Sequence, residues 1–171
     1  MGKQETMSAA EYQALYGSKK ILLPVKTGVK KGRSSNSEPV IKDSIEVGNG
    51  WCRITLAGVI QGLNGSGGLM QKHWVDISKE KDAFILRVMA LRAPKFPGKV
   101  RIIYTRFCAQ FMDIDNMVST AKLPLDALKA NKVIVDDNPN WIISFTPNQV
   151  KCRRKDQRTV VFIEEVTPIP S

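Results

Sequence analysis

The sequence has 171 residues, enough for one domain with a hydrophobic core but not for two full ones. Its 43% hydrophobic and 25% charged residues are ordinary for a globular protein, and no apolar run is long enough to span a membrane. Lys and Arg total 26 against 16 Asp and Glu, and a net charge of +10 favours a polyanionic partner such as nucleic acid. A basic protein without such a partner is the alternative.

The first 45 residues are predicted to form a short helix followed by a flexible basic extension. Ser8 and Glu11 have the spacing of a capping box for a helix over residues 8–17. Residues 19–43 are rich in Lys, Gly, Ser and Pro, and such a segment buries little apolar surface. The helix could dock onto a partner while the basic extension contacts nucleic acid, or both could form a tail without a role.

The folded domain is predicted over residues 46–171, and its first half mixes strand and helix. Residues 53–60 (RITLAGVI) are typical of a strand. A glycine-rich turn follows over residues 62–68, and it lacks the Lys-Ser/Thr of a phosphate-binding loop. Ser78 is placed to cap a helix that runs to about Arg92.

The second half continues this mixture. A strand is predicted over residues 100–111 and a helix over 116–130, in which Pro124 must introduce a kink or start a second segment. Further strands are predicted over residues 141–145 and 159–166. Because strands and helices do not alternate regularly, the sequence favours an α+β domain with a small mixed sheet packed against helices.

The acidic residues concentrate in one stretch of this basic chain. Five of them stand among three lysines within residues 113–137, a net charge of −2 that leaves +12 for the rest: Asp113, Asp115, Asp126, Asp136 and Asp137. If the preceding strand continued through Asp115, its two-residue period would place both carboxylates of the DID run on one side. Clustered carboxylates are the ligands that Mg²⁺ prefers, and they suit a metal-dependent phosphodiester enzyme.

These acids allow two other interpretations. A calcium-binding EF-hand loop from Asp113 is excluded, because its sixth position is Val118 and its twelfth is Pro124. The other interpretation makes the acids part of turns and helix caps without chemistry.

The order of several short motifs resembles the RusA-like Holliday junction resolvases, crossover junction endonucleases common in bacteriophages and prophages. The motifs are DIDN (113–116), Lys122, DAL (126–128) and VDD (135–137). The segment RITLAGVIQGLNG is similar to a divergent version of the family's opening strand and Asn-containing loop. The interval between DIDN and DAL is longer than the family's usual spacing.

The resemblance implies a catalytic site made of three aspartates and a lysine. The metal-binding aspartates fall on Asp113, Asp115 and Asp137, and the catalytic lysine falls on Lys122. The implied cofactor is Mg²⁺, or Mn²⁺ in its place, which would lower the pKa of a bound water and offset charge on the phosphate. Asp136 is expected to support the metal ligands or to be structural rather than to bind the metal, and Asp126 is expected to belong to helix packing or capping.

The implied function is the resolution of four-way DNA junctions by paired symmetric nicks, in recombination and repair. Two cuts call for two matched sites, which a homodimer supplies. The basic loop of residues 151–158 is expected to contact DNA phosphates, through Lys151, Arg153, Arg154, Lys155 and Arg158. A solvated hairpin tip is the alternative for this loop. A flap- or single-strand-cutting metal nuclease and a non-catalytic nucleic-acid-binding module are the alternatives for the whole protein.

The cysteines and the single histidine restrict the chemistry further. Cys52, Cys108 and Cys152 match neither a disulfide framework nor a zinc motif, so a reducing cytoplasm is expected. His73 is the only histidine, which excludes a His-based nucleophilic triad and a multi-histidine metal site. It is expected to be a structural or surface residue.

Overall fold

The computed structural model describes residues 41–62 and 72–166. The elements in chain order are β1 (Ser44–Gly48), β2 (Trp51–Ala57), α2 (Trp74–Ala90), β3 (Val100–Cys108), α3 (Ile114–Ser119), α4 (Lys122–Ala130), β4 (Ile142–Lys151), the 3₁₀ helix η2 (Arg154–Asp156) and β5 (Arg158–Glu165). The helix predicted over residues 8–17, most of the basic extension and all but the first residue of the glycine-rich turn lie outside the described residues.

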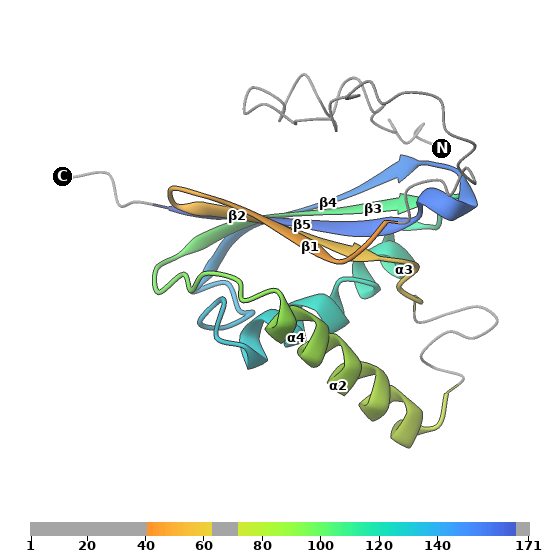
Figure 1. The fold of residues 1–171 in the computed structure, drawn as a ribbon, viewed down its shortest axis with the longest axis horizontal. Coiled ribbons are helices and arrows are strands. Elements are labelled where there is room, and N and C mark those ends of the chain that lie inside the picture. Colours follow the sequence, from red (N-terminus) through yellow and green to blue (C-terminus); the bar gives the residue numbers. More distant parts are fainter. Residues whose placement is uncertain (1–40, 63–71, 167–171) are drawn as a thin grey trace, which may run out of the picture.

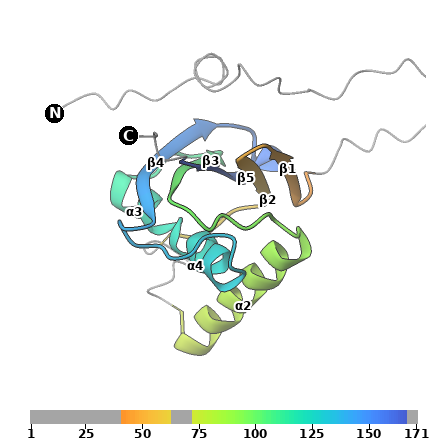
Figure 2. The ribbon, with the colours of Figure 1, turned by 90° about the vertical axis from the view of Figure 1, so that its left-hand side faces the viewer.

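The strands form one five-stranded mixed sheet in the order β1-β2-β5-β3-β4. β3 and β4 run parallel, whereas the other neighbouring strands are antiparallel. The helices α2 and α4 lie on one face of this sheet (Figures 1 and 2). The predicted α+β class with a small mixed sheet and packed helices is therefore confirmed.

The core lies between the sheet and the helices. β2 alternates strictly between buried and half-buried residues, and its buried members Cys52, Ile54 and Leu56 face the helices. Ile102 and Tyr104 of β3 belong to the same cluster, together with residues from all three helices. This single apolar layer holds the helices at a fixed place on the sheet.

A hairpin that the sequence analysis missed opens the sheet. β1 and β2 are joined by Asn49 and Gly50 alone, and Gly50 has a φ of 71°. Asn-Gly is a favoured pair for two-residue hairpins, and here the second position, Gly50, takes the left-handed backbone that glycine tolerates best. β1 therefore begins at Ser44, two residues before the predicted start of the domain.

The helix α2 begins earlier than predicted. It starts at Trp74, and His73 is its N-cap, with Nδ1 accepting a hydrogen bond from the Val75 amide at 3.4 Å. Ser78 lies within the helix, so the prediction that it caps the N-terminus was wrong. The exposed position of His73 confirms it as a structural and surface residue.

Pro124 separates the helical stretch after β3 into two segments. α3 ends at Ser119, and α4 starts at Lys122 with Pro124 in its first turn, where a missing amide hydrogen costs nothing. Of the two predicted outcomes, the second segment is the one observed.

The last two strands differ from the prediction in length and in pairing. β4 runs through residue 151 and pairs only with β3, at the edge of the sheet, where Pro147 is tolerated. β5 pairs with β2 and β3. The basic loop is therefore no hairpin tip: it crosses over the end of β3 to connect two strands that are not neighbours.

Candidate active site

The DIDN motif forms the start of a helix. β3 ends at Cys108, and Asp113 is the N-cap of α3, with an oxygen accepting a hydrogen bond from the Asn116 amide at 2.8 Å. Aspartate is among the best N-cap residues because its carboxylate satisfies an unpaired amide and suits the helix dipole. Asp115 lies exposed in the first turn. The expectation that strand geometry aligns these two carboxylates is therefore wrong, since no strand reaches them.

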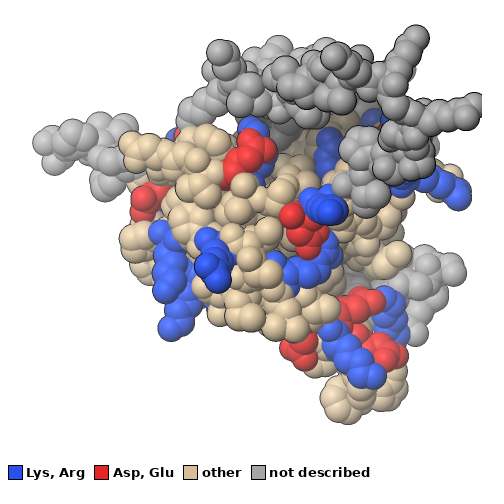
Figure 3. All heavy atoms as spheres, viewed as in Figure 1, with Lys and Arg blue, Asp and Glu red and all other residues tan. Residues whose placement is uncertain are grey.

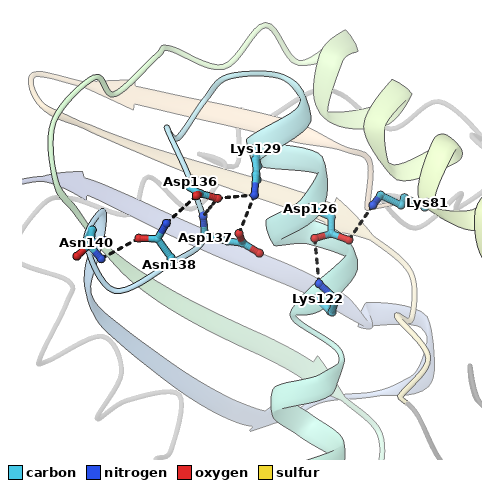
Figure 4. Close-up of polar contacts among 8 residues, drawn as sticks. All are labelled: Lys81, Lys122, Asp126, Lys129, Asp136, Asp137, Asn138 and Asn140. Carbon is cyan, nitrogen blue, oxygen red and sulfur yellow. Dashed lines mark hydrogen bonds and ion pairs between the residues drawn. The ribbon is translucent and has the colours of Figure 1, made fainter.

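Lys122 and Asp126 lie one turn apart on α4. Lys122 Nζ is 3.2 Å from one carboxylate oxygen of Asp126, and Lys81 Nζ of α2 is 3.1 Å from the other (Figure 4). Burial opposes ionisation of Asp126, but the two lysine hydrogen bonds outweigh it and hold its pKa below the ordinary value. Asp126 thus joins α4 to α2, as expected for a residue of helix packing.

The VDD motif lies in the loop after α4, where Lys129 pairs with both acids. Its Nζ contacts Asp136 and lies 3.1 Å from Oδ1 of Asp137 (Figure 4). Asp136 also accepts hydrogen bonds from the Asp137 amide at 2.9 Å and from the Asn138 side chain at 2.6 Å. The Lys129 hydrogen bond, aided by the Asp137 amide, lowers the pKa of Asp136 to about 2. Asp136 thereby shapes the turn, while Asp137 is held by a single exposed lysine.

A pocket of about 440 Å³ lies between α3, α4, the loop after α4 and β4. Its lining includes Val118, Ser119, Lys122, Leu125, Asp137 and Asn138, and we call it the α4 pocket. Two residues of the predicted site, Lys122 and Asp137, therefore meet at one cavity. Asp115 stands four residues before Ser119 on α3, on the helix face that leads to this pocket.

The predicted convergence of Asp113, Asp115 and Asp137 is not observed. Within residues 41–62 and 72–166 there is no group of three or more His, Cys, Asp or Glu side chains that could hold a metal ion. The physical reason is local, because Asp113 is engaged as a helix cap and Asp137 by Lys129. The carboxylates as they stand do not fit a divalent cation, which needs several oxygen ligands around one point.

The residues predicted to bind DNA surround the crossover after β4. Lys151 Nζ lies 5.3 Å from the ring centroid of Phe111, and the Arg158 guanidinium 3.8 Å from that of Phe107. Arg153 is paired with Asp156 at 2.7 Å. Arg154 and Lys155 lie exposed in η2. The structure therefore brings these side chains together at one end of the sheet.

The surface charge is otherwise scattered. On the face seen in Figure 3, Lys and Arg form separate groups, and the two signs are mixed along α2. Among the described residues visible on this face, Lys and Arg do not merge into one basic patch, and the crossover is the better candidate for phosphate contacts.

Two residues near these sites are not among those predicted from the sequence. Asn138 lines the α4 pocket, where its side chain donates to Asp136 and accepts from the Asn140 amide at 2.9 Å. The DDNPN run (136–140), whose residues favour a turn, is the sequence feature that could have indicated Asn138. Arg106 lines a second pocket, at the end of β3, and nothing in its local sequence distinguishes it from the other arginines.

No protein-family model matches the sequence, and no curated protein is a match for it. None of the helices in the described part of the chain is both long and apolar enough to cross a bilayer.

Proposed function

We propose that this protein is a RusA-like, Mg²⁺-dependent endonuclease that resolves four-way DNA junctions by paired nicks. The observation that carries the proposal is the meeting of Lys122 and Asp137 at the α4 pocket, beside the helix that DIDN begins. These residues belong to separate motifs of the family resemblance, and the chain folds so that they line one cavity.

The charges at the α4 pocket suit a phosphodiester. The ammonium group of Lys122, which is exposed and paired with Asp126, could offset the negative charge that develops on a phosphate, and Asp137 lines the same pocket. Binding of Mg²⁺ or Mn²⁺ by Asp113, Asp115 and Asp137 would require Asp137 to leave Lys129 and the three carboxylates to move together, with Asp113 engaged as the cap of α3. The pair of Asp137 and Lys129 is solvent-exposed, and such pairs are weak enough to be exchanged.

The remaining parts of the proposal follow from the substrate. A four-way junction has two strands to cut, so we place the active protein in a homodimer with two equivalent sites. Its three cysteines are free thiols in the structure, which is compatible with work in a reducing cytoplasm.

A non-catalytic nucleic-acid-binding module is the second candidate. It is favoured by the lack of a three-carboxylate group among the described residues and by the engagement of Asp113 as a helix cap. In that case the acids shape the structure, and the basic crossover supplies binding alone.

One experiment separates these functions. Labelled four-way, flap and linear duplex DNA are incubated with the protein, with and without Mg²⁺, for wild type and for Asp113→Asn, Asp115→Asn and Asp137→Asn. Asparagine caps a helix as well as aspartate does, so Asp113→Asn removes the charge and keeps the cap. The matched control is Asp82→Asn, an exposed acid on α2 away from the pocket.

The expected result is paired junction nicks that need Mg²⁺, vanish in the three site variants and persist in Asp82→Asn, with DNA binding retained throughout. Binding without any metal-dependent cutting would establish the binding module instead. Cutting of flaps or single strands in preference to junctions would establish the alternative nuclease.

A further inference from the structure

A second pocket, of about 370 Å³, lies under the crossover at the end of β3, and we call it the Arg106 pocket. It is lined by Arg106, by residues 109–112, and by Arg154 and Gln157 of the crossover. It shares no lining residue with the α4 pocket.

Hydrogen bonds hold the walls of the Arg106 pocket in place. Gln157 Oε1 accepts from the Ala109 amide at 3.1 Å, and its Nε2 donates to the Arg154 carbonyl at 3.1 Å. On the other side, Gln149 bonds both the amide and the carbonyl of Met112, at 3.1 and 2.8 Å. The shape of the cavity is thus fixed by hydrogen bonds within the fold.

Arg106 is a buried cation in this wall. It is only 7% exposed, and its Nη1 is shut off from solvent and has no hydrogen-bond partner. Buried donors are nearly always paired, and a lone buried charge is costly. Arg106, which lines the pocket, therefore holds a buried charge that is not fully satisfied by the protein.

No anionic side chain balances Arg106 within the described residues. Neither it nor Arg154 takes part in a salt bridge there, and the nearby Asp156 is engaged by Arg153. Its other neighbours are the thiols of Cys108 and Cys152, whose pKa values are raised by burial, so both stay neutral. The pocket carries positive charge without a counterion from the protein.

We propose that the Arg106 pocket binds a phosphate group, supplied by the backbone of DNA. Arg106 and Arg154 line the pocket from two elements, and the planar guanidinium fork of arginine matches phosphate oxygens. The pocket wall of residues 109–112 leads directly to Asp113, so a strand anchored here would enter the proposed nuclease site at the start of α3. The inference deepens the proposed function and rests on it only for DNA as the source of the phosphate.

The test uses the full chain and two probes, inorganic phosphate and a four-way junction. The first readout is the thermal midpoint in phosphate against chloride at equal ionic strength, since a ligand of the folded state raises the midpoint. The second is the junction Kd as a function of salt. The variants are Arg106→Met and Arg154→Gln, and the control is Arg101→Gln, an exposed arginine on the same strand outside the pocket. Arg154 is exposed, so its variant keeps the test valid if Arg106→Met fails to fold.

Phosphate is expected to stabilise wild type and Arg101→Gln, and to lose this effect in both pocket variants. Junction binding should weaken roughly tenfold in the pocket variants. The slope of log Kd against the logarithm of the salt concentration should fall by about one, the change expected for the loss of one phosphate contact. A lost phosphate effect with unchanged junction binding would support the phosphate site and overturn DNA as its source. Equal phosphate effects in all four proteins, or none in any, would overturn the proposal. If the wild-type protein showed no Mg²⁺-dependent nicking, the proposed nuclease function would be refuted, whereas the phosphate site would still stand.

Discussion

The α4 pocket and the Arg106 pocket differ in how their charges are balanced and in what holds their walls. At the first, both charged lining residues are paired, Lys122 with the half-buried Asp126 and Asp137 with Lys129, and the pocket rests on α4 and the following loop, whose apolar residues are buried in the core. At the second, a buried arginine has no matching acid, and glutamine side chains hold the walls.

This difference shows where the molecule has room to respond to a ligand. Exposed ion pairs exchange partners at little cost, so Asp137 at the α4 pocket can leave Lys129 for another cationic partner. A buried unpaired charge cannot be relieved by solvent, so the Arg106 pocket is prepared for an anion before one arrives.

The largest expected effect concerns the frame of the α4 pocket. Leu128 is 1% exposed and packs in the core beneath Lys129. Leu128→Ala should lower the free energy of unfolding by about 2–5 kcal/mol, through lost apolar burial and the cavity that remains. Urea unfolding measures this, and a cost well under 1 kcal/mol would mean that α4 is not held by the core as described.

A smaller loss is expected at the wall of the Arg106 pocket. Gln149→Ala removes both hydrogen bonds to Met112 and should cost about 1–3 kcal/mol, with faster hydrogen exchange at the Met112 amide. Gln110→Ala, an exposed glutamine of the same segment, should behave like wild type. If Gln149→Ala proved as costly as Leu128→Ala, the contrast between a polar and an apolar frame would not hold.

A gain in stability is expected from Arg106→Met in chloride buffer. Methionine has similar length and removes an uncompensated buried charge, so the free energy of unfolding should rise by about 1 kcal/mol. Chemical unfolding checks the sign. Destabilisation by this change would show that Arg106 contributes more through packing than its buried charge costs.

The smallest effect is a pH dependence at Asp136. Its pKa falls from 3.8 in the unfolded chain to about 2 in the fold, so the acid stabilises the protein above pH 4 and stops doing so as the pH falls through 2. Asp136→Asn keeps an acceptor for the turn but removes the charge. Its thermal midpoint should lie slightly below that of wild type near pH 6, and the two should converge near pH 2. A difference that persisted unchanged at pH 2 would point to a lost hydrogen bond rather than a lost ion pair.

Much of the local structure could be predicted because its signals are local. The alternation in 53–60 and the β-branched run from Val100 placed two strands, and Pro124 announced the break between α3 and α4. The boundaries of the elements were predicted less accurately. The N-cap His73 was missed because histidine is a less common cap than serine. The hairpin at Asn49 and Gly50 was missed although the Asn-Gly pair is a known signal for such a turn.

The candidate site was predictable only in part. The motif residues Lys122 and Asp137 do line one pocket, whereas Asp113 and Asp115 do not join them in a cluster. The predicted alignment of Asp113 and Asp115 needs a strand that continues to Asp115, but the chain leaves the sheet at Cys108 and Asp113 begins a helix.

The sequence by itself determined the α+β class, the break at Pro124 and the concentration of acids within a basic chain, because periodicity and composition are properties of neighbouring residues. Only the tertiary structure decided that β5 inserts between β2 and β3, and that the basic segment therefore crosses over the end of β3. That crossover brings Arg154 and Gln157 to the buried Arg106. Strand order depends on pairing between distant segments, which no local pattern records, and the pocket exists only once that pairing is made.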